Sequence, residues 1–131
     1  MDKKKILIID DDQDLALGLK VRLRANNYTT VFATDAVSAI SQANKESPDL
    51  ILLDLGLPAG DGFVVMERLD KIESLSSIPV IVMSARDPQA NKDRALGAGA
   101  KAYFQKPVDN DELLTAIRNL LGEANLLGEA S

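Results

Sequence analysis

Charged side chains follow several short apolar runs in this chain, each at the point where the run ends. They are Asp10 and Asp11 after residues 6–9, Asp54 after residues 50–53, and Lys106 after residues 102–105. Because the carboxyl ends of parallel strands meet at one edge of a sheet, we expect these side chains to lie close together. Clustered carboxylates repel one another unless a hard cation or a shared proton intervenes. A lysine beside them indicates charge neutralisation around a transferred phosphoryl group.

The composition excludes several classes of site and binding surface. The 131 residues carry a net charge of -5 and only 4% aromatic residues, so we expect no direct nucleic-acid binding by this segment. The absence of Cys and His excludes disulfides, thiolate or imidazole metal sites, and Ser–His or Cys–His nucleophile pairs. Any metal ion must therefore be bound by oxygen atoms.

The length and the N-terminal pattern indicate the class of protein. A chain of this length is in the usual size range of one globular domain. The first apolar stretch, residues 6–9, is too short for a signal-peptide core or a membrane span. We therefore expect a single-domain cytoplasmic protein that does not associate with a membrane.

Short apolar runs alternate with helical patterns along the chain. The runs that we expect to be buried strands cover residues 6–9, 29–33, 50–53, 79–83 and 102–105. The helical stripes between them include Leu15, Leu19 and Leu23, then Ala36, Ala39, Ile40 and Ala43, then Phe63, Met66, Leu69 and Ile72. Five strand–helix units with right-handed crossovers predict a three-layer, doubly wound α/β fold with an open parallel sheet.

The last two predicted helices differ in apolar content. Asp87 can cap the earlier helix and Pro88 can take its first position, but few bulky apolar residues follow. We expect this helix to be the most mobile. The final helix should begin at Asp109, with Glu112 as its capping-box partner. Its expected buried residues are Leu113, Leu114, Ile117, Leu120 and Leu121.

Four motifs in order along the chain carry a family resemblance. They are Ile8-Ile9-Asp10-Asp11-Asp12, residues 48–58 together with Gly60-Asp61-Gly62, Met83-Ser84-Ala85, and Tyr103-Phe104-Gln105-Lys106-Pro107. Each motif alone is weak, but all four at these intervals resemble the receiver domain of bacterial two-component response regulators. The resemblance implies a flavodoxin-like (βα)5 receiver domain over residues 4–121, with strand order 2-1-3-4-5.

The resemblance also implies the central chemistry. Asp54 would accept a phosphoryl group from a sensor histidine kinase or a histidine phosphotransfer protein, forming an acyl phosphate. Mg²⁺ would be bound by Asp11, by Asp10 mostly through water, by Asp54 and by the backbone carbonyl of Gly56. Such a protein is not an enzyme in the usual sense, because it catalyses only its own phosphorylation and dephosphorylation.

Further residues receive roles from the same resemblance. The Ser84 hydroxyl would donate to one phosphoryl oxygen and Lys106 would pair with another, and the peptide bond before Pro107 is expected to be cis. Movement of Ser84 toward the phosphoryl group, with Tyr103 swinging inward, would change the surface of the fourth helix, fifth strand and fifth helix. That surface would control an effector domain or a docking protein.

Other readings stay open on the sequence alone. Taken singly, these residues have plainer roles as helix caps, a surface lysine or strand-end side chains. Residues 6–12 also match the Asp-x-Asp start of haloacid-dehalogenase-type phosphatases, with Asp10 as nucleophile. That fold needs a further acidic pair at a strand end, and the only aspartates after Lys106 are Asp109 and Asp111, at the start of a predicted helix. A third reading is a receiver-like adaptor that takes no phosphate, against which the complete set of acceptor, hydroxyl and lysine argues.

Residues 122–131 are expected to form a C-terminal tail or the start of a linker helix. An approximate heptad seam could extend the last helix into a dimerising linker, which makes a homodimer possible. Its positions are Leu113, Ile117, Leu120, Ala124 and Leu127. A frayed tail is favoured, because Gly122 and Gly128 each cost about 1 kcal/mol within a helix.

Overall fold

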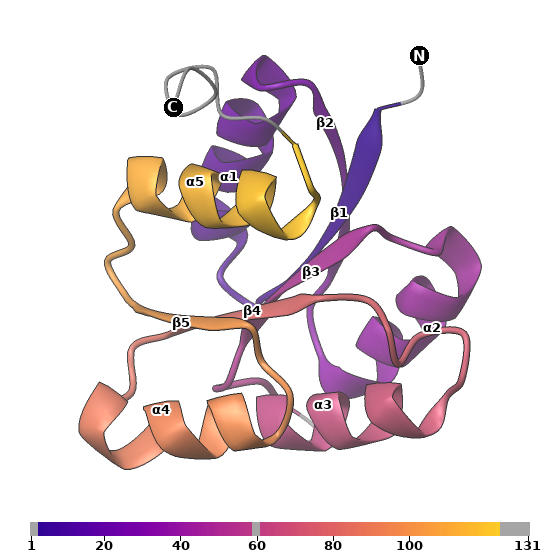
Figure 1. The fold of residues 1–131 in the computed structure, drawn as a ribbon, viewed down its shortest axis with the longest axis vertical. Helices are drawn as coiled ribbons and strands as arrows, with labels where there is room; N and C mark the ends of the chain where they lie inside the picture. Colours follow the sequence, from indigo (N-terminus) through magenta and orange to yellow (C-terminus); the bar gives the residue numbers. More distant parts are fainter. Residues whose placement is uncertain (1–2, 59–60, 124–131) are drawn as a thin grey trace.

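The computed structural model describes residues 3–58 and 61–123, in which strands and helices alternate (Figure 1). The strands β1 to β5 are Lys4–Ile9, Tyr28–Ala33, Leu50–Asp54, Val80–Ser84 and Ala102–Gln105. The helices α1 to α5 are Gln13–Ala25, Ala36–Glu46, Gly62–Lys71, Pro88–Gly97 and Asn110–Leu120. All strand pairs are parallel, in the order β2-β1-β3-β4-β5. The predicted doubly wound fold is confirmed.

Helices cover both faces of the sheet. Helices α1 and α5 lie on one face, and α2, α3 and α4 lie on the other (Figure 1). Adjacent residues of the central strand β3 point into different cores: Leu52 packs in the cluster with α1 and α5, and Leu53 packs in the cluster with α2 and α3. Because both faces are covered, the central strands are continuous apolar runs rather than alternating patterns.

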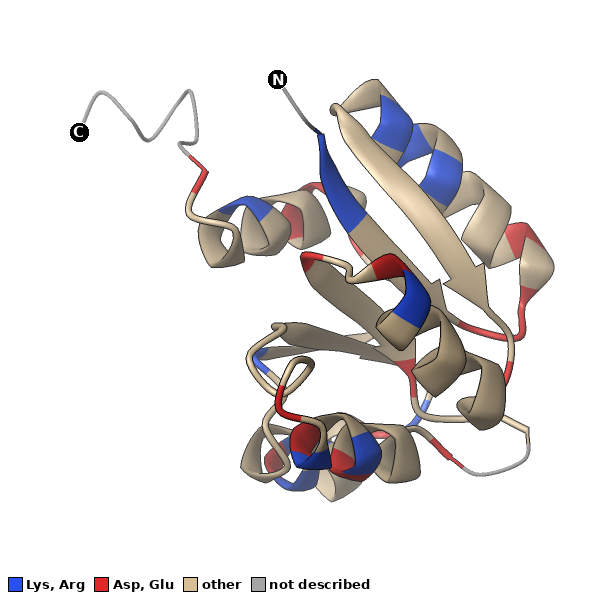
Figure 2. Ribbon diagram, turned by 90° about the vertical axis from the view of Figure 1, so that its right-hand side faces the viewer, with Lys and Arg blue, Asp and Glu red and all other residues tan. Residues whose placement is uncertain are grey.

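Each of the five helices begins with an aspartate cap. The caps are Asp12, Asp35, Asp61, Asp87 and Asp109, whose carboxylates accept backbone N–H groups of the first turn. In α1 the charges also follow the helix dipole, with acidic residues at its start and basic residues in its second half (Figure 2). These caps fix the points at which the chain leaves the sheet edge and enters each helix.

The capping box expected at the start of α5 is only half formed. The Asp109 carboxylate accepts the backbone N–H of Glu112 at 3.1 Å, but no return bond from the Glu112 side chain is present. A reciprocal box occurs instead at α2, where Asp35 and Ser38 bond each other's backbone N–H groups at 2.7 and 3.3 Å. A short Ser side chain therefore fills the role expected of Glu.

Strand register brings the predicted site residues to one edge. Asp54 is opposite Met83, and Ser84 is opposite Gln105, so β3 and β4 each extend one residue further than the apolar runs indicated. The pairing of Ile9 with Leu53 puts Asp10 next to Asp54 at the end of the ladder. A polar residue can end a strand and still take part in its pairing, which the apolar pattern alone does not register.

Helix α4 is thinly packed, as its composition indicated. Ala95 is its only buried residue, whereas α3 buries five. A cation–π contact supplements this packing, because the Arg94 guanidinium lies 3.8 Å from the centre of the Phe63 ring. The greater mobility of α4 stays a prediction.

Helix α5 ends at Leu120. The N–H of Gly122 donates to the Asn119 carbonyl at 3.2 Å and the N–H of Glu123 to the Arg118 carbonyl at 2.9 Å, with Gly122 at φ 70°. This Schellman motif stops the helix before the tail. The remaining tail positions, residues 124–131, lie outside the described residues, and with them most of the predicted linker helix. No helix in the described ranges is both long and apolar enough to cross a membrane.

The central strand should tolerate truncation poorly. Leu52 is fully buried in β3, so Leu52→Ala should lower the free energy of unfolding by about 2–5 kcal/mol through lost burial and a cavity. Urea denaturation followed by circular dichroism measures the change. Leu17→Ala is the matched control, because Leu17 is 59% exposed and should change stability little. Equal losses in the two variants would contradict the assigned core.

Candidate functional site

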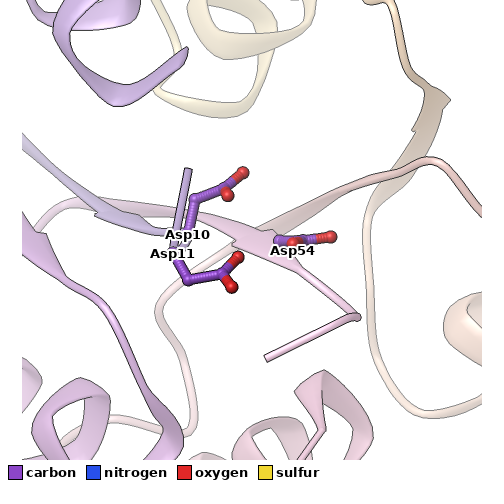
Figure 3. A group of neighbouring side chains, drawn as sticks. All are labelled: Asp10, Asp11 and Asp54. Atoms are coloured by element: carbon purple, nitrogen blue, oxygen red, sulfur yellow. The ribbon is translucent and has the colours of Figure 1, made fainter. Parts of the chain in front are cut away.

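The three aspartates predicted at one sheet edge lie together. Asp10 and Asp11 follow β1, and Asp54 is the last residue of β3. One carboxylate oxygen of each lies within 4.8 Å of the others, and the side chains extend to the same side (Figure 3). Asp10 and Asp54 are 2% and 7% exposed, whereas Asp11 is exposed to solvent. The cluster is therefore largely buried but reachable through Asp11.

Asp12 stands apart from this cluster and organises it. Its carboxylate accepts the N–H of Leu15 at 3.1 Å and caps α1. Its own N–H donates to Asp10 Oδ1 at 2.9 Å. The turn between β1 and α1 thus orients the buried Asp10 carboxylate, while the Asp12 side chain serves the helix.

Lys106 brings a compensating positive charge to the same point. Its Nζ lies 2.8 Å from Asp10 Oδ2 and 3.7 Å from Asp54 Oδ2. Its backbone N–H donates to the Ser84 carbonyl at 2.8 Å, and the peptide bond between Lys106 and Pro107 is cis. The ammonium group therefore lies between carboxylates at the ends of two strands, β1 and β3.

Burial and charge pairing oppose each other at this site. Burial raises the pKa of Asp10 above its ordinary value, although the hydrogen bond from Lys106 lowers it in part. For Lys106 burial alone would lower the pKa, but the hydrogen bond and charge of Asp10, with the charge of Asp54, raise it above its ordinary value. The lysine therefore stays protonated, while burial disfavours the charged form of the Asp10 carboxylate.

Ser84 and Tyr103 meet at the backbone of Arg86. The Ser84 hydroxyl is buried and accepts the Arg86 N–H at 3.0 Å. The Tyr103 hydroxyl donates to the Arg86 carbonyl at 3.0 Å, and its half-buried ring packs on the core beneath α2 and α3. One peptide segment after β4 therefore connects the two predicted switch residues, a link that no sequence pattern revealed.

The loop after β3 completes the site. The backbone N–H of Gly56 donates to Asp54 Oδ1 at 3.3 Å. Beyond this loop, Asp61 Oδ2 lies 3.9 Å from Arg86 Nη1, and Asp61 Oδ1 caps α3. The cap was readable in principle as an Asp directly before a helical stripe. The contact with Arg86 depends on loop geometry and had no sequence signal.

The donor set fits a magnesium ion. Mg²⁺ prefers oxygen ligands, is usually bound by only a few protein groups, and keeps several water molecules. Three convergent carboxylates with one solvent-exposed member supply such a set, and their mutual repulsion favours a bound cation. A buried carboxylate, a neighbouring lysine and a set of cation ligands are together the parts that phosphoryl transfer to a carboxylate requires.

Comparisons with known proteins point to one family. The response regulator receiver domain family matches residues 6–118. The transcriptional regulatory protein KdpE of Staphylococcus aureus is 40% identical over 116 residues, which cover 88% of this chain and 49% of the relative. The DNA-binding dual master transcriptional regulator RpaA of Synechocystis is 35% identical over 127 residues, covering 97% and 53%. The chain thus spans about half the length of these relatives.

Solved structures give the same result. A putative response regulator from Chloroflexus aurantiacus superposes with a TM-score of 0.87 at 29% identity, covering 92% of this chain and 99% of that one. The receiver domain of the sensor histidine kinase PA1611 from Pseudomonas aeruginosa gives 0.84 at 26% identity, with the same coverages, and has a magnesium ion in its active-site cleft. With the acidic cluster, the lysine and the strand order, these matches show that the chain belongs to the response regulator receiver domains of two-component signalling.

Proposed function

We propose that Asp54 accepts a phosphoryl group from a sensor histidine kinase or a histidine phosphotransfer protein. One observation carries this proposal: the convergence of three carboxylate oxygens within 4.8 Å, with the Lys106 ammonium 3.7 Å from Asp54. An Asp54 oxygen would attack phosphorus as the P–N bond of phosphohistidine breaks. The imidazole nitrogen keeps the bonding electrons and takes up a proton, and an acyl phosphate forms.

The neighbouring residues would neutralise the negative charge of the transferred phosphoryl group. Asp11, Asp54 and the Gly56 carbonyl would bind Mg²⁺ directly, with Asp10 mostly through water. The chemistry that Mg²⁺ would supply there, when bound by these residues, is neutralisation of negative charge on the transferred oxygens. Lys106, already bridging two carboxylates, would exchange part of that pairing for a phosphoryl oxygen.

The structure supports a route for the switch. The Ser84 hydroxyl accepts the Arg86 N–H, and the Arg86 carbonyl accepts from Tyr103. A Ser84 hydroxyl drawn toward a phosphoryl oxygen would release the Arg86 N–H and loosen the bond to Tyr103. The thinly packed α4 follows this segment, so the surface of α4, β5 and α5 would change with it.

Several wider assignments belong to the same proposal. The changed surface would act on an effector domain or a docking protein, in the cytoplasm, as a monomer or homodimer. The chain would catalyse its own phosphorylation and dephosphorylation only. The phosphatase reading is disfavoured, because Asp109 caps α5 and Asp111 lies in its first turn rather than at a strand end near Lys106.

Labelling tests the acceptor directly. Incubation with phosphoramidate and Mg²⁺ should add one phosphoryl group to the wild type by intact mass, and Asp54→Asn should abolish this gain because the nucleophilic oxygen is lost. Asp14→Asn, a helix aspartate outside the cluster, is the matched control and should label normally. Persistent labelling of Asp54→Asn would remove Asp54 as the acceptor.

Cation binding should stabilise the fold, because it relieves carboxylate repulsion. At a Mg²⁺ concentration ten times its dissociation constant the gain should be about 1.4 kcal/mol, seen as a higher Tm by calorimetry. Asp11→Ala should lose most of this gain, while Asp14→Ala should keep it. A Tm that does not respond to Mg²⁺ in the wild type would count against the metal site.

Lys106 should matter more for the switch than for the fold. Lys106→Met keeps the length of the side chain but removes its charge, so labelling should persist at a rate reduced roughly 10²-fold. Hydrogen exchange in α4 and β5 should then change less on labelling than in the wild type. Lys101→Met, at an exposed position before β5, controls for charge. A wild-type exchange response in Lys106→Met would contradict the coupling role.

A further inference from the structure

Helix α3 approaches the end of β3 unusually closely, and the contact lies at Gly62. The N–H of Gly62, the first residue of α3, donates to the Leu55 carbonyl at 2.8 Å. A Cβ built on Gly62 would lie 2.7 Å from the Asp54 carbonyl oxygen, 2.8 Å from Leu55 Cα and 3.0 Å from Leu55 Cδ2. The first two distances are shorter than real Cβ contacts allow, so no other residue fits without movement.

The constraint at Gly62 is one of space rather than backbone conformation. Its φ is outside the left-handed region, so an alanine could adopt the same backbone angles. The atoms that block a side chain are backbone atoms of Asp54 and Leu55, which cannot rotate away as a side chain can. A methyl group would therefore have to displace the peptide between these two residues.

The segment that would yield is the loop after β3. Helix α3 is anchored by four buried side chains beyond Gly62, namely Phe63, Val65, Met66 and Leu69. Strand β3 is held by ladders to β1 and β4 on either side. The peptide between Asp54 and Leu55 lies beyond the last ladder pair, Asp54 with Met83, and the exposed Gly56 follows it. Displacement would thus fall on the backbone that carries the Asp54 carboxylate and the Gly56 carbonyl.

From this geometry we infer that Gly62 is a positioning residue for phosphoryl transfer. Its missing side chain lets α3 press against the acceptor backbone, which sets the Asp54 carboxylate relative to Asp10 and Asp11 and aims the Gly56 carbonyl. The inference rests on the proposed function of Asp54 and adds to it a residue that contacts neither phosphate nor metal. A displacement near 1 Å in a reacting group can cost about 10²-fold in rate.

The test is the Mg²⁺ dependence of labelling by phosphoramidate, followed by intact mass over time in the wild type and in Gly62→Ala. We expect Gly62→Ala to label 10- to 100-fold more slowly and to need more Mg²⁺ for half-maximal rate. Gly18→Ala and Gly97→Ala are matched controls, because a Cβ at either helical glycine meets nothing within 4 Å. Both should label as the wild type does.

An osmolyte distinguishes the positioning role of Gly62 from a role in stabilising the fold alone. Trimethylamine N-oxide strengthens burial, so it restores folding to a destabilised variant without repositioning the acceptor. Circular dichroism checks folding in each sample. A Gly62→Ala protein that labels at the wild-type rate in buffer overturns the inference, and so does one that reaches that rate once the osmolyte is added. A Gly62→Ala protein that stays unfolded in the osmolyte also overturns it, because the contact then serves the whole fold. If the wild type takes no phosphoryl group, the proposed function itself is wrong and the positioning role falls with it.

Discussion

The repulsion among three carboxylates at one sheet edge is the constraint on which the rest of the structure depends. Asp10 and Asp54 are buried, so water screens their charges little, and one lysine cannot neutralise the cluster with Asp11. Burial raises the pKa of Asp10 above its ordinary value, and the negative charge of Asp54 adds to the rise. Holding such a cluster requires a frame whose stability comes from elsewhere, and the sheet core provides it.

The frame is densely packed on one side of the site and thinly packed on the other. Strands β1, β3 and β4 are buried on both faces, and α3 buries five residues: Gly62, which abuts the end of β3, and four side chains in the core cluster that contains Leu53 and Leu55. Helix α4 contributes a single buried side chain, Ala95, and depends on contacts such as that of Arg94 with Phe63. Packing around Asp54 is therefore dense where α3 meets β3, and it is sparse after β4, where we expect the greater freedom to move.

The sequence predicted those parts of the molecule that repeat a local pattern. Apolar runs and helical stripes revealed all five strand–helix units, and the strand ends located the aspartates and Lys106, because parallel strands must end at one edge. Contacts made between loops had no such periodicity. The bonds that join Ser84 and Tyr103 through Arg86, and the close approach at Gly62, depend on how separate segments pack. A half-formed capping box at α5 likewise reflects side-chain freedom that no motif fixes.

This division explains how a local change of charge could act at a distance. A phosphoryl group on Asp54 would add negative charge where the backbone is held by α3, so the acceptor itself has little room to respond. The response then falls on groups that can exchange partners, which are the Lys106 ammonium and the Ser84 hydroxyl. The Ser84 hydroxyl accepts the backbone N–H of Arg86, and the thinly packed α4 begins two residues after Arg86. A rigid acceptor beside a loosely held helix therefore favours movement of the helix over distortion of the site.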